Sequence, residues 1–123
     1  MTSTKTVLLV DDSPTVRQVM RLALERAGYG VMEAGDGEHA LQQLDGRRVS
    51  AIVCDLAMPK LDGMSFLKQM RALQHYRFTP VVMLTTESRA ERKQDAKQLG
   101  AQAWATKPCP PSQLVDIVNR LAR

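Results

Sequence analysis

Four short apolar runs, each followed by a chemically reactive side chain, constrain what this chain can fold into. They are VLLV before Asp11 and Asp12, IVC before Asp55, VVML before Thr85, and AWA with Thr106 before Lys107. Short β-branched runs of this kind predict strands. If the strands are parallel neighbours, their carboxyl ends share one edge of a sheet, where open α/β proteins place ligands and chemistry. We therefore expect the carboxylates, the hydroxyl and the amine to share one pocket.

Helical patterns alternate with these runs. Ser13 and Pro14 predict a helix start, with Ser as the N-cap and Pro at the first helical position, and Gly28 predicts its end. We expect strands at residues 5–10, 31–34, 49–54, 80–84 and 101–106, with a turn and cap at residues 35–37. The side chains expected on the inner helix faces are Val16, Val19, Met20, Ala23 and Ala27, then Ala40, Leu41 and Leu44, then Phe66, Leu67, Met70 and Leu73, and finally Leu114, Ile117, Val118 and Leu121.

The helix predicted at residues 88–99 differs from the others. Its only large apolar residue is Leu99, with Ala90 and Ala96 as the other candidates for a buried face. Weak docking and high mobility are the expectation for so polar a helix. Five strand–helix units in alternation predict an α/β fold, a parallel sheet covered on both faces with right-handed crossovers.

Length and composition agree with a single domain over residues 1–123. The chain is 44% apolar and 24% charged, and it contains no stretch of about 18 apolar residues and no signal-like start. We expect a complete stand-alone domain without an output domain, located in the cytoplasm and not in a membrane. Cys54 and Cys109 lack metal-ligand spacing and are expected to be reduced thiols.

A net charge of +4 and a pI of about 9.4 raise the question of nucleic-acid binding. The basic residues are scattered singly or in pairs, and aromatic residues make up only 4% of the chain. Neither a continuous basic stripe nor a base-stacking platform is present in the sequence, so no direct nucleic-acid binding is expected.

Three clustered carboxylates need a strong positive charge beside them to stay ionised together. Hard oxygen ligands suit Mg²⁺, which keeps several waters and is often completed by a phosphoryl oxygen. Lys107 would add a second cation, and Thr85 a hydroxyl donor. This set suits phosphoryl transfer to a carboxylate, with Asp55 as the nucleophile and an acyl phosphate as the product.

Four motifs, VLLVDDSPTVR, IVCDLAMPKLDG, VVMLTTE and WATKP, are spread over nearly the whole chain. In these motifs the chain resembles response-regulator receiver domains of two-component signalling, of the stand-alone CheY-like type. The resemblance implies a flavodoxin-like (βα)5 three-layer sandwich with a five-stranded parallel sheet in the order 2-1-3-4-5. It also implies a signalling switch that catalyses only its own phosphorylation and dephosphorylation, and so not an enzyme in the ordinary sense.

Residue roles follow from the resemblance position by position. Asp55 would be phosphorylated, Thr85 would follow the phosphoryl group, and Lys107 would grip it. Mg²⁺ would be bound directly by Asp12, Asp55 and the backbone carbonyl of Ala57, and through water by Asp11. The Lys107–Pro108 bond is expected to be cis.

Two positions depart from the family pattern. Trp104 stands where the switch aromatic is usually Tyr or Phe, and its larger indole, which donates but cannot accept a hydrogen bond, disfavours a fully buried rotamer. Thr86 replaces the small residue common after the switch hydroxyl, which predicts narrower access to the phosphoryl group and slower loss of phosphate.

The resemblance names the partners by class. A sensor histidine kinase or a histidine phosphotransfer domain would donate the phosphoryl group. A downstream protein would read the face formed by the fourth helix, fifth strand and fifth helix, with the chain a monomer or a phosphorylation-dependent dimer in a chemotaxis, motility or other pathway. His39 and His75 are expected to be exposed and not to donate a phosphoryl group.

Two other functions are compatible with parts of this pattern. An aspartate-nucleophile phosphatase would use the same metal chemistry but needs a second acid and a cap over its substrate. A flavodoxin-like cofactor binder would place phosphate-binding residues after the first strand, where this chain has the acidic sequence DDSPT.

Overall fold

The computed structural model describes residues 5–56, 58, 61–85 and 90–122. Five strands form one sheet in which every neighbouring pair is parallel. They are β1 (Thr6–Val10), β2 (Gly30–Ala34), β3 (Ala51–Asp55), β4 (Val81–Thr85) and β5 (Ala103–Thr106). The order β2-β1-β3-β4-β5 confirms the predicted fold and topology.

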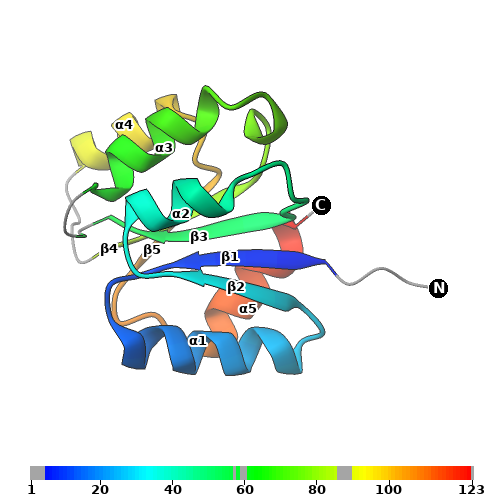
Figure 1. The fold of residues 1–123 in the computed structure, drawn as a ribbon. Coiled ribbons are helices and arrows are strands. Elements are labelled where there is room, and N and C mark those ends of the chain that lie inside the picture. The colour runs from blue at the N-terminus through cyan, green and yellow to red at the C-terminus, as the bar shows by residue number, and fades with distance from the viewer. Residues whose placement is uncertain (1–4, 57, 59–60, 86–89, 123) are drawn as a thin grey trace.

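Helices cover both faces of the sheet, so the molecule has three layers (Figure 1). Helices α1 (Pro14–Arg26) and α5 (Pro111–Leu121) lie on one face. Helices α2 (Gly37–Gln43), α3 (Gly63–Arg71) and α4 (Ala90–Gln98) lie on the other, and a short 3-10 turn, η1 (Gln74–Tyr76), follows α3.

Alternating strand residues divide the core into two clusters, as the two-residue period of a strand requires. Leu8, Ile52 and Met83 pack on the face of α2, α3 and α4, together with Phe66 and Met70. The intervening strand residues pack against α1 and α5; this second cluster includes Val7, Leu9, Val53, Leu84, Leu24, Leu114 and Val118. Burial on both faces explains why the strands read as continuous apolar runs.

Helix starts follow the local signals in the sequence. The Ser13 hydroxyl accepts a hydrogen bond from the Val16 amide, and the Asp36 carboxylate accepts one from the His39 amide. Each satisfies a backbone donor that the helix itself leaves unpaired. At the other end of α1, Gly28 has φ of +98°, a left-handed conformation that glycine adopts without steric cost.

The predicted inner faces of α1 and α3 need correction. Val19 is 46% exposed, whereas Leu24, which the predicted face omitted, is fully buried. Leu73 is 36% exposed because α3 ends at Arg71, so Leu73 lies in the turn that follows. For α1 the predicted face was displaced around the helix, which is easy because each residue turns the helix by 100°. For α3 the predicted helix extended past its actual end.

Several element boundaries also differ from the sequence prediction. Residues 49–50 and 101–102 lie outside β3 and β5, although Val49 is buried. Helix α4 ends at Gln98, so Leu99 follows it, and residues 88–89 of the predicted helix lie outside the described residues. Ala96 is buried as expected, and His39 and His75 are exposed.

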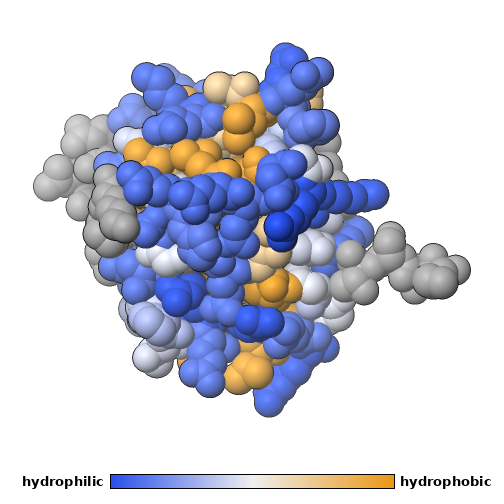
Figure 2. All heavy atoms as spheres, viewed as in Figure 1, coloured by the Kyte–Doolittle hydropathy of each residue, from blue (hydrophilic) through white to orange (hydrophobic). Residues whose placement is uncertain are grey.

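The surface is mostly polar on the face that Figure 2 presents, with hydrophobic atoms confined to small patches. Both cysteines are free thiols. Within the described residues, every helix is too short or too polar to span a bilayer.

Candidate functional site

The acidic pocket lies where β1 and β3 end, at one edge of the sheet. Asp11 follows β1 directly, and Asp55 is the last residue of β3, one register position beyond the Val10–Cys54 pair. Asp11 is fully buried and Asp55 is 5% exposed, while Asp12 is exposed. One carboxylate oxygen from each of Asp11, Asp12 and Asp55 lies within 4.8 Å of the other two.

Asp11 is held by hydrogen bonds at every polar group. Its amide donates to the Ala34 carbonyl at 3.1 Å, and its Oδ1 accepts from the Ser13 amide at 2.9 Å. Its Oδ2 accepts from Lys107 Nζ, and its carbonyl accepts from Arg17 Nη1. A buried carboxylate needs such partners because leaving it unpaired costs several kcal/mol, roughly.

Lys107 bridges the two buried acids. Its Nζ lies 2.9 Å from Asp11 Oδ2 and 3.0 Å from Asp55 Oδ2, and its side chain is 22% exposed. Partial burial opposes the charge of the ammonium, but the hydrogen bonds and charges of Asp11 and Asp55 outweigh it and raise the pKa of Lys107 above its usual value. The Lys107–Pro108 peptide bond is cis.

Thr85 and Trp104 lie on the strands beside the pocket. Thr85 is the buried last residue of β4, and its carbonyl accepts a hydrogen bond from the Lys107 amide at 2.9 Å. Trp104 pairs in register with Met83, two residues before Thr85. Residues two apart in a strand share a face, so Thr85 and Trp104 lie on the side of the sheet that α3 and α4 cover.

Trp104 is half-buried and packs against the core cluster of that face. Its Nε1 is buried and has no hydrogen-bond partner among the residues that the structure describes. A fully buried rotamer of this indole is expected to be disfavoured, and the side chain is half-buried here; its role as a switch residue stays a prediction. Ala57 and Thr86, the other two positions with expected roles, lie outside the described residues.

The donor set fits Mg²⁺. Three carboxylates converge from two strand ends, two of them are buried, and the partly exposed ammonium of Lys107 cannot balance three negative charges. Oxygen ligands with one solvent-facing member, here Asp12, suit a hard cation that retains several of its waters. The carboxylates of Asp11, Asp12 and Asp55 are the groups that could hold such an ion.

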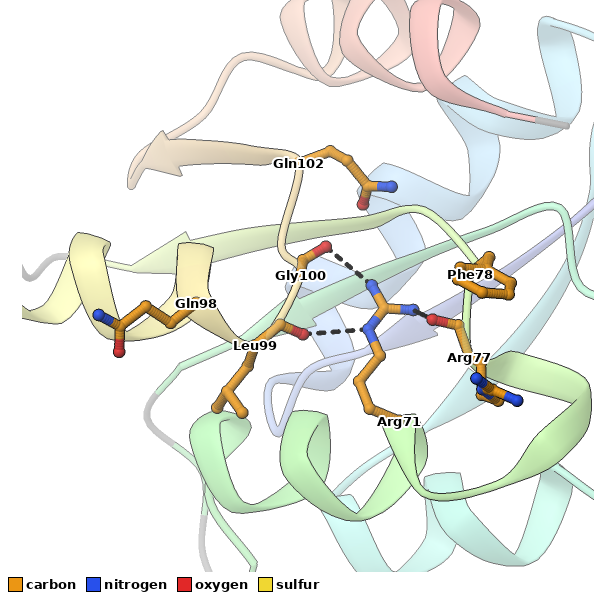
Figure 3. Close-up of a pocket in the computed structure, with 7 residues that line it drawn as sticks. All are labelled: Arg71, Arg77, Phe78, Gln98, Leu99, Gly100 and Gln102. Carbon is orange, nitrogen blue, oxygen red and sulfur yellow. Dashed lines mark hydrogen bonds between the residues drawn. The ribbon is translucent and has the colours of Figure 1, made fainter.

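A cavity lies at the opposite edge of the sheet, before β4 and β5 begin, and none of its lining residues belongs to the acidic cluster. It has a volume of about 450 Å³, and Arg71, Arg77, Phe78 and Gly100 are among its lining residues (Figure 3). The Arg71 guanidinium donates to the carbonyls of Leu99 and Gly100 at 3.0 and 2.8 Å, and also to those of Tyr76, Arg77 and Thr79. Arg71 therefore ties the end of α3 to the turn between α4 and β5.

Two residues beside the acidic pocket were not singled out from the sequence, Arg17 and Glu33. Arg17 lies in α1 one turn after the acids, and Glu33 lies in β2. Their ion pair, 3.2 Å from Nε to Oε1, joins helix α1 to strand β2 through two residues that are 16 positions apart in the chain. Of the two, only Arg17 gave a local signal in the sequence, as a basic residue six positions after Asp11.

Comparison with known proteins agrees with the geometry. Residues 7–119 match the response regulator receiver domain family. The chain is 36% identical over 119 residues to the alkaline phosphatase synthesis transcriptional regulatory protein PhoP of Bacillus subtilis, covering 97% of this chain and 49% of PhoP. It is 34% identical to the sensory/regulatory protein RpfC of Xanthomonas campestris, covering 94% of this chain and 16% of RpfC. The chain thus spans half or less of these two relatives.

Solved structures match over nearly their full length. The chemotaxis protein CheY4 of Vibrio cholerae is 40% identical with a TM-score of 0.92, and the match covers 97% of this chain and 99% of CheY4. The receiver domain of a Pseudomonas aeruginosa sensor histidine kinase is 29% identical with a TM-score of 0.87, covering 97% and 98%. In that structure a magnesium ion is coordinated in the active site cleft.

Proposed function

The chain belongs to the response regulator receiver family, and we propose that it works as a phosphoacceptor switch whose reactive group is the Asp55 carboxylate. The observation that carries this assignment is the position of Asp55, a nearly buried acid at a strand end within reach of both a cation and two further carboxylates. Burying a carboxylate costs free energy, so a buried acid at this strand end favours a functional role for it.

The reaction follows from the contacts of Asp55. A carboxylate oxygen of Asp55 forms a bond to the phosphorus of a phosphohistidine, the bond from phosphorus to imidazole nitrogen breaks, and its electron pair returns to the ring. Lys107, 3.0 Å from Asp55 Oδ2, is placed to follow the charge onto the phosphoryl oxygens. Thr85 offers a hydroxyl at the neighbouring strand end. When bound, Mg²⁺ supplies electrostatic stabilisation of the transferring group.

The donor is proposed to be a sensor histidine kinase or a histidine phosphotransfer domain, and the protein is proposed to act on no other substrate. The signal would leave by contact of a downstream protein with the face of α4, β5 and α5, whether the chain stays a monomer or dimerises on phosphorylation. Likeness to CheY4 over nearly the full length of CheY4 supports a CheY-like regulator. Its pathway is proposed to be chemotaxis or another two-component pathway, and its location the cytoplasm.

Incubation with acetyl phosphate and Mg²⁺ tests the assignment directly. Intact-mass analysis is expected to show an adduct of about 80 Da in the wild type and none in Asp55→Asn. Asp116→Asn, an exposed acid of α5, is the matched control and should retain the adduct. An adduct that persists in Asp55→Asn would remove Asp55 as the acceptor. Turnover of p-nitrophenyl phosphate, or a flavin absorbance band, would favour the phosphatase or the cofactor binder.

A further inference from the structure

Arg17 occupies a position that helix stability does not explain. It lies in the first turns of α1, where the helix dipole disfavours a cation, and its side chain is only 19% exposed. Side chains of a helix point back toward its N-terminus, so Arg17 reaches over the loop that carries Asp11 and Asp12. The guanidinium lies against the turn after β2, where a Cβ added to Gly35 would come within 3.4 Å of Nη1.

The two acceptors of Arg17 connect the acidic loop to β2. Nη1 donates to the backbone carbonyl of Asp11 at 2.5 Å, and Nε donates to Glu33 Oε1 at 3.2 Å. The Asp11 carbonyl belongs to the peptide plane that joins Asp11 to Asp12. Asp12 is exposed, so the direction of its carboxylate depends on how this backbone is held. Arg17 thus fixes the plane between the two acids, and Glu33 fixes Arg17.

We propose that Arg17, held by Glu33, is a positioning residue that sets the geometry of the acidic pocket for Mg²⁺ by fixing the peptide plane between Asp11 and Asp12. The proposal rests on the proposed function in that it takes Mg²⁺ as the ion of this pocket. Arg17 would act through the backbone that joins Asp11 to Asp12 and not by contact with the ion. Groups that orient metal ligands in this way commonly change metal affinity by about 10- to 100-fold when removed.

The charge of Arg17 alone predicts the opposite change in Mg²⁺ affinity when the residue is removed. Arg17 is a cation beside the pocket, and its removal would make the site more negative, which favours Mg²⁺. Loss of positioning instead weakens Mg²⁺ binding. The direction of the change in Mg²⁺ affinity therefore separates the two roles.

The experiment is a calorimetric titration of MgCl₂ into the wild type and three variants. Arg17→Met is expected to bind Mg²⁺ about 10-fold more weakly. Arg17→Lys keeps the charge but cannot span both acceptors as a planar fork, so it should be weakened to a similar degree. Arg21→Met is the matched control, because Arg21 also contacts Glu33 but its side chain pairs with Glu25 and Glu33 and not with the acidic loop; the Mg²⁺ affinity of this variant should be unchanged.

A second readout follows the loop itself. Amide hydrogen exchange at Asp12 and Ser13 without Mg²⁺ should be faster in Arg17→Met than in Arg21→Met. Tighter Mg²⁺ binding by Arg17→Met, full affinity in Arg17→Lys, or equal weakening in Arg21→Met would each overturn the proposal. If Arg17→Met does not fold, the Mg²⁺ affinity of Arg17→Lys provides the same test. If neither variant folds, the proposal is overturned, because Arg17 is then required for the stability of the fold.

Phosphorylation measured in parallel keeps the two proposals apart. At saturating Mg²⁺, Arg17→Met should regain most of the wild-type rate with acetyl phosphate, because a weakened site can still be filled. A wild type that binds Mg²⁺ but takes no phosphoryl group would overturn the proposed function. The Mg²⁺ affinities of the variants would still decide the role of Arg17. A wild type that binds no Mg²⁺ would overturn the role of Arg17.

Discussion

Lys107 Nζ lies 3.0 Å from Asp55 Oδ2, although the two residues are 52 positions apart in the chain. The same ammonium contacts Asp11, 96 positions away. One cation thus holds together acids that arrive from two different strands. The pocket is therefore assembled from distant segments, and its properties depend on each of them being in place.

Replacement of Lys107 by Met should destabilise the protein most when Mg²⁺ is absent. The change leaves two buried carboxylates facing each other without their shared cation, and we expect a loss of about 1–3 kcal/mol, limited by the partial exposure of Lys107. Mg²⁺ should recover part of the loss because it restores positive charge. Urea unfolding with and without Mg²⁺ measures this, with the exposed Lys68→Met as control; an equal loss in both conditions would contradict it.

Arg71→Ala should lower the free energy of unfolding by about 2–4 kcal/mol, because it leaves several partly buried carbonyls without a donor. Arg77→Ala, at a neighbouring exposed position, is the control and should have little effect. Urea midpoints report the difference. A loss in Arg71→Ala no larger than that in Arg77→Ala would mean that water replaces the guanidinium at no cost.

Alkaline pH should destabilise the protein. Burial, and then the charges of Asp55, Asp11 and Asp62, raise the pKa of Cys54 well above its usual 9.0, and the pKa of Lys107 lies above 10.5. A group whose pKa is raised by folding contributes stability below its unfolded pKa and loses it as the pH rises toward the folded value. The urea midpoint should therefore fall above about pH 9, with a shallower fall in Cys54→Ala. A midpoint independent of pH in this range would contradict the prediction.

Trp104 is the single tryptophan of the chain, so its emission reports one position. If Trp104 takes part in the switch, phosphorylation should shift this emission, because the indole leaves or enters its half-buried site. Thr85→Ala should abolish the shift while retaining the phosphoryl adduct, whereas Thr15→Ala, an exposed threonine, should leave the shift unchanged. An unaltered spectrum in fully phosphorylated wild type would exclude Trp104 as a switch residue.

Much of this protein could be predicted from the sequence because the signals are local. Strand runs, the Ser13 and Asp36 caps and the Gly28 helix end depend on neighbours a few positions away. The convergence of the acids was also predictable, since the ends of adjacent parallel strands must meet at one edge. The sheet order itself came from the resemblance to a family and not from any single run.

Tertiary structure alone decided the contacts that cross the molecule. The ion pair of Arg17 with Glu33 depends on how α1 lies across β2, and the five carbonyls around Arg71 come from two separate segments, residues 76–79 and 99–100. The exposure of Val19 depends on how helix α1 is rotated about its axis, which its packing against the rest of the molecule decides. Such contacts bring together groups far apart in the chain, so no local pattern of residues encodes them.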